Sequence, residues 1–375
     1  MTTSEAYDVI IIGGGLAGLC CALHLQKYEL KILLIEKQSY PKHKVCGEYV
    51  SNEVLPYLGW LNIDPKAHGA VPINQFEIST RHGETIESGL PLGGFGMSRY
   101  ALDTLLYNEV VPKSEVVIDT VTSVEFQDNI FVVNTQSKKS FQAPYAVGAF
   151  GKRSILDKQM DRKFVNERTH WMAVKAHYDY SFPENKVALH NFEGGYCGLS
   201  QTETGAVNAC YLTTLKSFRA CDSLEEFQQK VMSENSRLKD FFENAIPLFE
   251  KPLTISQISF AKKSIIEDHI FMLGDSAGLI HPLCGNGMAM AIHSAKLFSE
   301  LYLKEIRNKN GNRDSLEHAY KKAWKANFAE RLRTGSRIQR LLLNNTAASF
   351  AYTAVNRFPS ILPYIIKKTH GTALV

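Results

Sequence analysis

The chain has 375 residues, which is long for a single hydrophobic core, so we expect two intimately connected domains. Apolar residues make up 45% and charged residues 21% of the sequence, a composition typical of an ordinary globular protein. The net charge of +4 is too small to indicate nucleic-acid binding, and no basic tract interleaved with aromatic residues occurs. Nucleic acid is therefore not an expected partner.

The seven cysteines form no CxxC pair and no metal-ligand spacing, so we predict reduced thiols and no metal site. The N-terminal segment carries no basic region, and the apolar run Val9–Ile12 is far too short for a signal peptide. No uninterrupted apolar run approaches the length of a transmembrane helix. We therefore expect a cytoplasmic protein.

The first strong motif is YDVIIIGGGLAG, residues 7–18. Its β-branched run Val9–Ile12 is typical of a strand buried in a parallel sheet, and the residues after the glycines have helical spacing. Gly13 suits the tight turn from strand to helix, and Gly15 lets a pyrophosphate approach bare backbone at the helix N-terminus. A second apolar strand ends in Glu36, whose carboxylate can accept hydrogen bonds from the two hydroxyls of a ribose. This order of elements predicts a dinucleotide, without saying which one.

Two features follow that are open to more than one interpretation. Cys46 and Gly47 lie in a loop after the second strand, where a small pair lets the chain pass near a flat cofactor; a free thiol at a loop bend is the alternative. Ser98 is a good N-cap for a helix over 99–111. Arg99 is then placed badly for the helix dipole, which indicates either a phosphate partner or a surface ion pair with Asp103.

The central part of the sequence has the alternation of antiparallel strands. A hairpin is predicted within 71–90, and further strands within 171–260 are interrupted by one helical stretch at 223–244. The C-terminal part is predicted to form helices at 315–345 and 350–368, and the second should be broken near its prolines. Arginines alternate with apolar residues there, which gives the helices an amphipathic face. This face can be interpreted as a solvated outer surface or as a site of contact with a membrane surface.

Two later motifs stand in a fixed order after the first one. VGAFGKRS occupies residues 147–154, and FMLGDSAGLIHPLCGNGMAMAI occupies residues 271–292. Together with the first motif they resemble the FAD-dependent superfamily of p-hydroxybenzoate hydroxylase-like monooxygenases, geranylgeranyl reductases and flavin halogenases. Within it, the motifs are most similar to the geranylgeranyl reductase-like branch. The resemblance implies non-covalently bound FAD.

The same resemblance implies an α/β fold. It predicts a Rossmann-like FAD-binding domain of the glutathione-reductase type, interleaved with a mostly antiparallel β-sheet substrate domain and followed by a helical C-terminal region. We expect the FAD-binding domain at 1–70, 96–155 and 265–300, and the substrate domain at 71–95 and 156–264. Residues 301–375 form the C-terminal helices.

The expected cofactor-binding residues follow from the matched motifs. In these families the acid of the Gly-Asp motif contacts the ribityl chain, and the Pro-x-x-Gly-x-Gly segment places a helix N-terminus near the flavin pyrimidine. The set carried over to this chain comprises Gly13, Gly15, Leu16, Ala17, Gly18, Glu36, Lys37, Cys46, Gly47, Arg99, Val121, Gly274, Asp275, Pro282, Gly285, Asn286, Gly287 and Met288. Cys46 is also the candidate catalytic residue.

Several departures from the family patterns bear on the reaction. Phe150 stands where the hydroxylases usually carry an Asp, and Gly278 stands where they commonly carry a His. Cys46–Gly47 resembles the reductases, but GGYCGLS at 194–200 matches their aromatic substrate segment only at Tyr196. Glu77 stands where a rough alignment puts the halogenase lysine, so halogenation is disfavoured.

These observations leave two nearly equal functions for an FAD-dependent oxidoreductase. The first is a monooxygenase that hydroxylates a lipophilic or phenolic small molecule, slightly favoured because the full reductase segment is absent. The alternative is flavin-dependent reduction of carbon–carbon double bonds in a prenyl or lipid substrate. A non-catalytic FAD-binding protein is a remote third reading.

The electron donor is expected to be NADPH, NADH or a partner flavin reductase. Phe150 stands where the hydroxylases have an acid, and the sequence has no second Gly-x-Gly-x-x-Gly unit for a nicotinamide nucleotide. Reduction of the flavin by NADPH alone should therefore be slow in the absence of substrate. The expected substrate is lipophilic, and the C-terminal helices have an amphipathic face. We therefore also consider peripheral contact with a membrane through these helices.

Overall fold

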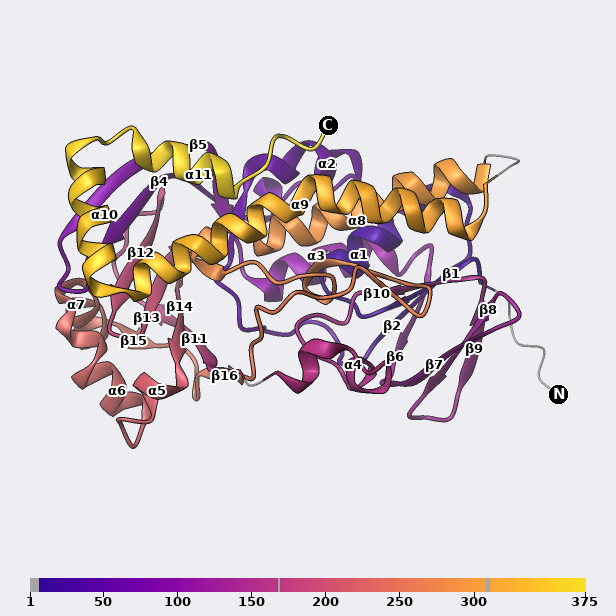
Figure 1. Cartoon of the computed structure of the whole chain (residues 1–375), viewed down its shortest axis with the longest axis horizontal. Helices are drawn as coiled ribbons and strands as arrows, with labels where there is room; N and C mark the ends of the chain where they lie inside the picture. The colour runs from indigo at the N-terminus through magenta and orange to yellow at the C-terminus, as the bar shows by residue number, and fades with distance from the viewer. Residues whose placement is uncertain (1–6, 168, 308–310) are drawn as a thin grey trace.

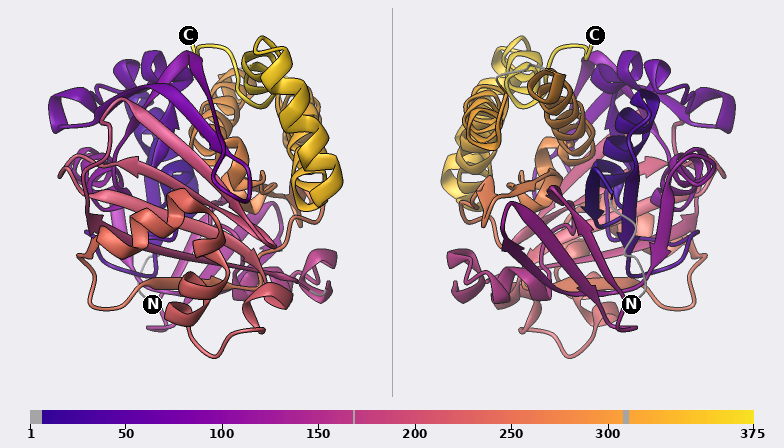
Figure 2. Two further views of the ribbon diagram at one scale, coloured as in Figure 1. Left: turned by 90° about the vertical axis from the view of Figure 1, so that its left-hand side faces the viewer. Right: turned by 90° about the vertical axis from the view of Figure 1, so that its right-hand side faces the viewer.

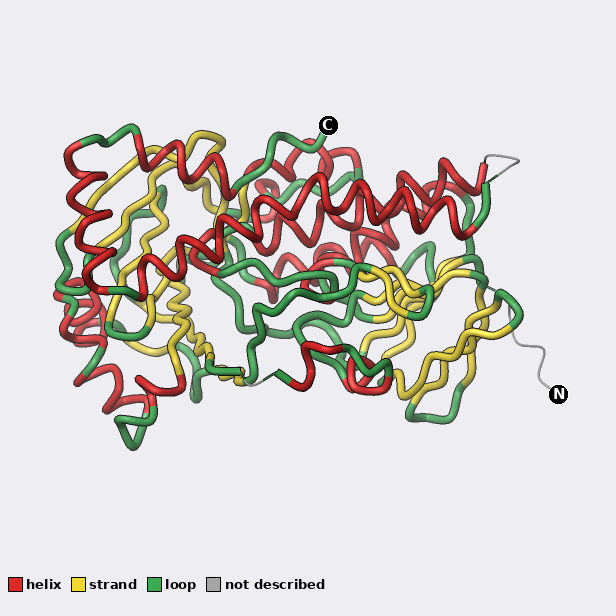
Figure 3. Tube along the Cα trace, in the orientation of Figure 1, coloured by secondary structure: helices red, strands yellow, loops and turns green. Residues whose placement is uncertain are grey.

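The computed structural model describes residues 7–167, 169–307 and 311–375, and all structural statements below refer to these. Its strands form two large sheets at opposite ends of the molecule, joined by long helices (Figure 1; Figure 3). The predicted fold class is confirmed: a Rossmann-like unit is combined with a mostly antiparallel sheet and C-terminal helices.

The first sheet carries the nucleotide-binding motif. Its β1 strand pairs in parallel with β2 and β10, and β10 pairs in parallel with β18. The apolar residues of β1 and β2 are buried on both faces of this sheet: helices cover one face, and a small β-meander with one short helix covers the other. In spatial order the strands are β17 (Ile266–Glu267), β18 (Ile270–Met272), β10 (Tyr145–Gly148), β1 (Val9–Ile12), β2 (Ile32–Glu36) and β6 (Glu115–Ile118).

The second sheet is larger and mostly antiparallel, with one parallel pair between β4 and β12. In spatial order it contains β15 (Ile246–Pro247), β11 (Trp171–Asp179), β14 (Val207–Thr214), β13 (Gly195–Gln201), β12 (Lys186–Phe192), β4 (Val71–Ser79), β5 (Thr85–Gly96) and β3 (Tyr49–Ser51), with β16 (Leu253–Ser256) beside β11. A small meander packs near β1 and comprises β7 (Val121–Gln127), β8 (Ile130–Thr135) and β9 (Ser140–Ala143).

Each face of the large sheet has its own apolar cluster, because successive side chains of a strand point to opposite faces. One face packs against helices α6 (Leu224–Lys230) and α7 (Ser236–Asn244) through residues such as Val174 and Phe227. The other face carries Ala173, Leu189, Tyr196, Leu212, Ile258 and Leu279, with Val45, Phe76, Ile78, Trp171, Ile255, Phe260 and Leu283 packed against them. We call this second set the inner apolar cluster, because it includes residues of the cofactor-binding loops.

The helices connect the two sheets. Helix α9 extends along most of the molecule, and α10 and α11 turn back beside β4 and β5 (Figure 1; Figure 2). The helices are α1 (Leu16–Leu25), α2 (Leu55–Trp60), α3 (Arg99–Val110), α4 (Ile155–Gln159), α5 (Leu215–Phe218), α6 (Leu224–Lys230), α7 (Ser236–Asn244), α8 (Gly287–Arg307), α9 (Arg313–Leu343), α10 (Asn345–Arg357) and α11 (Ile361–Thr369). Short 3-10 turns lie at Gln26–Tyr28, Asn52–Val54, Lys66–His68, Lys163–Asn166, Met232–Glu234, Gly274–Ser276 and Pro282–Cys284.

Two expectations about helices need correction or refinement. The single helix expected at 223–244 is two helices, α6 and α7, because Asn235 takes an extended conformation and caps α7 through its side chain. The break expected near the C-terminal prolines lies between α10 and α11, around Pro359. Pro363 stands in the first turn of α11, where a missing N–H costs little.

Candidate functional site

The three sequence motifs meet at one edge of the parallel sheet. They follow β1, β10 and β18, which are neighbouring parallel strands, so their carboxyl ends lie side by side. The backbone continues the pairing past the strands: Ala149 N donates to Ile12 O at 2.8 Å, and Leu273 N donates to Gly148 O at 3.0 Å. Crevices at this edge are where open α/β sheets bind ligands.

The glycines of the first motif build a cradle without side chains. Gly13 has φ +107°, and a Cβ there would lie 2.4 Å from Ala149 O. A Cβ on Gly15 would meet two cationic groups, Arg99 Nη2 at 3.7 Å and Lys44 Nζ at 3.8 Å. Bare backbone, the N-terminus of α1 and two cations therefore converge on one point, which suits a pyrophosphate.

Glu36 ends β2 and is 6% exposed. Its carboxylate accepts hydrogen bonds from Gly14 N at 2.6 Å, Gln38 N at 3.1 Å and Lys42 Nζ at 2.6 Å. Burial alone would raise its pKa, but the hydrogen bond and charge of Lys42, with Lys44 and the Gly14 N–H, hold the pKa below its ordinary value. A carboxylate offers about four acceptor positions, so binding both ribose hydroxyls requires Lys42 to give up its position.

Arg99 forms the ion pair with Asp103, but the pair is not at the surface as the sequence suggested. Arg99 Nε and Nη2 donate to the two oxygens of Asp103 at 2.7 Å each, and Lys44 Nζ donates at 2.8 Å. Asp103 has no exposed surface. Burial alone would raise its pKa, but Arg99 and Lys44 hold the pKa below the ordinary value. Two cations share one anion beside Gly15, which leaves positive charge for a phosphate.

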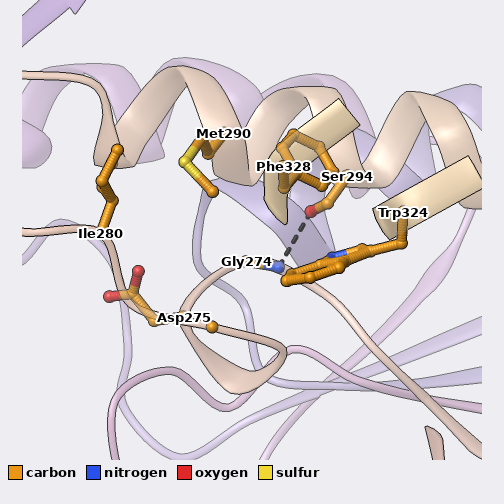
Figure 4. A pocket seen from close by; sticks show the side chains of 9 residues that line it. Gly274, Asp275, Ile280, Met290, Ser294, Trp324 and Phe328 are labelled. Carbon is orange, nitrogen blue, oxygen red and sulfur yellow. Dashed lines mark hydrogen bonds between the residues drawn. The ribbon is translucent and has the colours of Figure 1, made fainter. Parts of the chain in front are cut away.

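The Gly-Asp motif lies under helices α8 and α9. Gly274 N donates to Ser294 Oγ of α8 at 2.9 Å, and Trp324 and Phe328 of α9 close the same space (Figure 4). The cavity there has a volume of about 10 Å³, room for roughly one water molecule, so it does not hold a flavin ring. A Cβ on Gly278 would lie 3.2 Å from Trp324 and Leu332. Helix α9 thus occupies the space that the His of the hydroxylases would need.

The segment from Pro282 to Gly287 leads into the long helix α8. Gly285 has φ +61°, and a Cβ there would lie 3.1 Å from the ring of Tyr49. Leu283 N donates to Tyr196 Oη of β13 at 3.0 Å, so the large sheet fixes this segment. Asn286 is buried, its Nδ2 donates to Thr369 O at 2.8 Å, and its Oδ1 has no protein partner among the described residues. The free oxygen is available to a donor on a ligand.

Charged side chains tie the second motif to the third. Gly151 N donates to Ser276 Oγ at 2.8 Å, and Arg162 Nη2 donates to Ser276 O at 2.9 Å. Lys263 Nζ donates to the backbone oxygens of Lys152 and Asp275 at 2.8 Å each. Burial lowers the pKa of Lys263 to about 8, although Asp275 acts in the opposite direction. Sequence reasoning missed this lysine because no motif contains it.

The Cys46–Gly47 loop is fixed to the inner face of the large sheet. Asn208 Nδ2 of β14 donates to Cys46 O at 3.2 Å, and Ser200 Oγ of β13 donates to Gly47 O at 3.3 Å. The preceding residue, Val45, packs in the inner apolar cluster. Cys46 itself is half-buried. Burial alone would lower the pKa of Arg99, but Asp103, with a smaller contribution from Cys46, raises the pKa above its ordinary value. The loop therefore adjoins both the phosphate cradle and the apolar face.

Glu48 follows in that loop and is the centre of a buried network that the sequence did not reveal. It has φ +57°, a left-handed conformation that non-glycine residues adopt only when their surroundings enforce it. Its carboxylate accepts from Lys175 Nζ at 2.5 Å, Arg99 N at 2.7 Å and His177 Nε2 at 2.7 Å. Burial alone would raise the pKa of Glu48, but His177 and Lys175 hold it below the ordinary value.

His43 lies close to this network, and its ligand atom and those of Glu48 and His177 are all within 4.8 Å of one another. Two histidines and a carboxylate can hold a divalent cation. The ammonium group of Lys175 already neutralises the same carboxylate, so a cation would meet a positive charge there. We therefore interpret the cluster as an ionic network that joins the loop to β11.

The remaining expected residues lie near the same edge with less specific contacts. Leu16 and Ala17 form the first turn of α1, and Met288 lies in the first turn of α8. Lys37 is exposed beside Glu36, and Val121 is buried at the start of β7. Their roles toward a cofactor stay predictions.

The geometry fits FAD as the bound group. The glycine cradle with two cations suits the pyrophosphate, Glu36 suits the ribose, and the N-terminus of α8 suits a partly anionic ring. When bound, FAD supplies hydride and electron chemistry that side chains do not provide. The fold and this edge of the sheet thus define a flavoprotein.

Comparison with known families agrees with this assignment. The model of the FAD binding domain family matches residues 110–326, more than half of the chain, and an FAD dependent oxidoreductase model matches residues 8–45. The protein belongs to the FAD binding domain family and is an FAD-dependent oxidoreductase.

Its curated relatives include proteins named digeranylgeranylglycerophospholipid reductase. A digeranylgeranylglycerophospholipid reductase of Methanococcus vannielii is 24% identical over 86% of this chain and 83% of its own. The corresponding reductase 1 of Methanosphaera stadtmanae is 23% identical over 86% of this chain and 81% of its own.

Solved structures share the fold at low sequence identity. The flavin-dependent brominase Bmp2 has a TM-score of 0.79 at 16% identity and covers 97% of this chain and 93% of its own. PqsL of Pseudomonas aeruginosa, described as a probable FAD-dependent monooxygenase, has a TM-score of 0.73 at 15% identity. It covers 93% of this chain and 100% of its own. Among the described residues, no helix combines the length and apolarity needed to cross a bilayer.

Proposed function

We propose that this protein reduces a carbon–carbon double bond in a lipophilic, isoprenoid-like substrate, with FAD as cofactor. Two curated relatives that span most of this chain carry the name of a digeranylgeranylglycerophospholipid reductase. Gly278 and the Cys46–Gly47 pair support the same branch. This reading reverses the slight preference for hydroxylation that the sequence alone suggested.

The position of Cys46 is the observation that carries the proposal. Its loop is held by Asn208 and Ser200 against the inner face of the sheet, next to the inner apolar cluster. Val45 belongs to that cluster, while the next residue, Cys46, packs against the core of the parallel-sheet domain. A lipophilic chain on the inner apolar cluster would thus lie close to a thiol that can donate a proton.

Reduction of a double bond needs a hydride at one carbon and a proton at the other. Bound, reduced FAD supplies the hydride. The Cys46 thiol donates its proton to the second carbon, and solvent then restores a proton to the sulfur. The carbon–carbon double bond becomes a single bond and two carbon–hydrogen bonds form. NADPH, NADH or a partner reductase would be the source of the two electrons for each turnover.

Hydroxylation is the second candidate. It is favoured by GGYCGLS at 194–200, which lacks most of the aromatic substrate segment of the reductases. Halogenation is not favoured, because Glu77 stands at the position of the halogenase lysine and forms an ion pair with Lys186 at 2.8 Å. The side chain of Glu77 also lies on the opposite face of the sheet from Phe76 and Ile78, which belong to the inner apolar cluster.

Substitution of Cys46 distinguishes the two candidates. If the thiol is the proton donor, C46A and C46S should lose about 10²–10⁴-fold in turnover, the usual contribution of a positioned acid. A hydroxylase should lose only about tenfold through altered shape, roughly 1.4 kcal/mol of barrier. The measurement is product formation from an unsaturated isoprenoid with chemically reduced enzyme. Full activity of both variants would contradict the proton-donor role.

A substrate of this kind resides in membranes, so we also propose peripheral membrane contact through α10 and α11. Phe350, Phe358 and Tyr364 are 74%, 60% and 62% exposed, with Lys367 and Lys368 nearby in the sequence. Aromatic and basic residues together favour anionic membrane surfaces. Sedimentation with vesicles containing anionic lipid should fall in a F350S/F358S variant, and unchanged sedimentation would oppose the proposal.

A further inference from the structure

Helix α9 packs on the body through one buried stripe that ends in a polar residue. The buried positions are Leu316, Tyr320, Trp324, Phe328, Gly335 and Gln339. Tyr320 Oη donates to Met272 O at 2.8 Å, so its polar atom is paired. Gln339 is 3% exposed, and neither its Oε1 nor its Nε2 has a partner among the described residues.

An unpaired buried carboxamide is unfavourable, because it loses its hydrogen bonds to water and gains none in return. Such a group is normally retained where something else completes its hydrogen bonds. An apolar side chain of similar volume would fill the same position of the stripe without this cost. Gln339 therefore points to a partner outside the described chain.

His281 is a second polar group with the same property and lies next to α9. A Cβ on Gly335, one turn before Gln339, would lie 3.9 Å from His281 Cβ and 3.0 Å from Cys284 Sγ. His281 is 7% exposed, and its Nδ1 has no partner among the described residues. Burial, assisted by the charge of Arg340, lowers its pKa to about 4, so the ring is neutral near pH 7.

The surroundings of His281 are apolar. Its ring stacks on Phe260 with centroids 3.9 Å apart, and Phe260 contacts Trp171 in the inner apolar cluster. Leu279 and Leu283, on either side of His281 in the sequence, belong to the same cluster. His281 thus lies at the margin of an apolar surface beside α9, and Gln339 follows one turn after Gly335, the residue of that helix that approaches His281.

We propose that Gln339 and His281 bind the neutral polar group of the substrate, a hydroxyl or a comparable oxygen, while its apolar body packs on the inner apolar cluster. The inference rests on the proposed function and deepens it. Gln339 offers both a donor and an acceptor, which matches a hydroxyl. Neither group is charged, so a free carboxylate or phosphate is not the preferred ligand.

The test uses purified holoenzyme with oxidised FAD, titrated without oxygen or reductant while flavin absorbance is recorded. The probes are geranylgeraniol with its hydrocarbon analogue, and 2-naphthol with naphthalene. The variants are Q339M and H281F, with R337Q at an exposed position of the same helix as control. Thermal unfolding and FAD content of each variant are measured in parallel.

The wild type should bind the hydroxyl-bearing member of a pair about tenfold or more tightly, as one or two new hydrogen bonds imply. Q339M should reduce this preference to within about threefold and retain FAD, and R337Q should keep the preference. A preference that survives in Q339M, or a Q339M protein that no longer folds, would show that water or protein already pairs the amide and would overturn the inference. Binding of the naphthol pair alone would contradict the isoprenoid substrate but not Gln339. Absence of binding by all four probes would contradict the proposed function itself.

Discussion

Two buried carboxylates in the same part of the chain, Glu36 and Glu48, are held in different ways. Glu36 accepts hydrogen bonds from Gly14 in the turn after β1, and from Gln38 and Lys42 in the loop after β2. Glu48 accepts from Arg99, and from Lys175 and His177 on strand β11 of the other sheet. Both have a pKa below the ordinary value, and in both the opposing effect of burial is overcome by cationic or hydrogen-bonding partners.

This difference in hydrogen-bond partners indicates a different role for each carboxylate. Glu36 is held by replaceable partners at the edge of the sheet, as suits a ligand for ribose. Glu48 has no exposed surface and joins the cofactor loop to the substrate-side sheet, as suits a structural link. We therefore expect changes at Glu36 to affect FAD and changes at Glu48 to affect folding.

The largest effect is expected at Glu48. E48Q leaves the fully buried Lys175 ammonium without a counter-charge, which should lower the free energy of unfolding by about 3–5 kcal/mol. Urea unfolding of the protein measures this directly. A double variant E48Q/K175M should recover much of the loss, because it removes the unpaired charge as well. A loss below about 1 kcal/mol in E48Q would show that the network carries little stability.

A smaller effect, on cofactor rather than fold, is expected at Glu36. E36A should weaken FAD binding by roughly 1.5–3 kcal/mol, about ten- to a hundredfold, as expected for hydrogen bonds to a charged group. Fluorescence titration of apoprotein with FAD measures the affinity. D275A should lose a comparable amount, and unchanged FAD affinity in E36A would remove the ribose assignment.

The smallest expected effect is the pH dependence of the stability that Glu48 contributes. A carboxylate whose pKa is lowered by folding contributes stability above the unfolded value, ordinarily near 4.5, and loses that contribution as pH falls through the lower folded value. The stability difference between wild type and E48Q should therefore shrink as pH decreases below about 4.5. Urea unfolding at pH 7 and pH 3.5 compares the two, and a difference that stays constant would mean that folding does not lower the pKa of Glu48.

The same comparison explains what the sequence was able to predict. Strand β1, the glycine turn, α1 and Glu36 depend on short-range patterns, so their arrangement followed from residues 7–36 alone. The pairing of Glu48 with Lys175 joins residues 127 positions apart, and no local pattern marks either one. Arg99 shows the intermediate case, because its partner Asp103 was evident from helical spacing but its burial depended on the tertiary packing.

The C-terminal part shows a further limit of local patterns. The helices α9, α10 and α11 were expected, but the path of α9 over Gly278 and His281 was not. That path depends on small residues such as Gly335, which let the helix approach the 280–284 segment closely. Gln339 and its unpaired amide only become visible once this packing is known.

The most direct test of the central claim is the mass of the product formed by chemically reduced holoenzyme from an unsaturated isoprenoid alcohol. Double-bond reduction predicts a gain of two hydrogens, with product formed in the absence of oxygen. A product that gains one oxygen atom and forms only in air would contradict the reductase assignment and establish the hydroxylase.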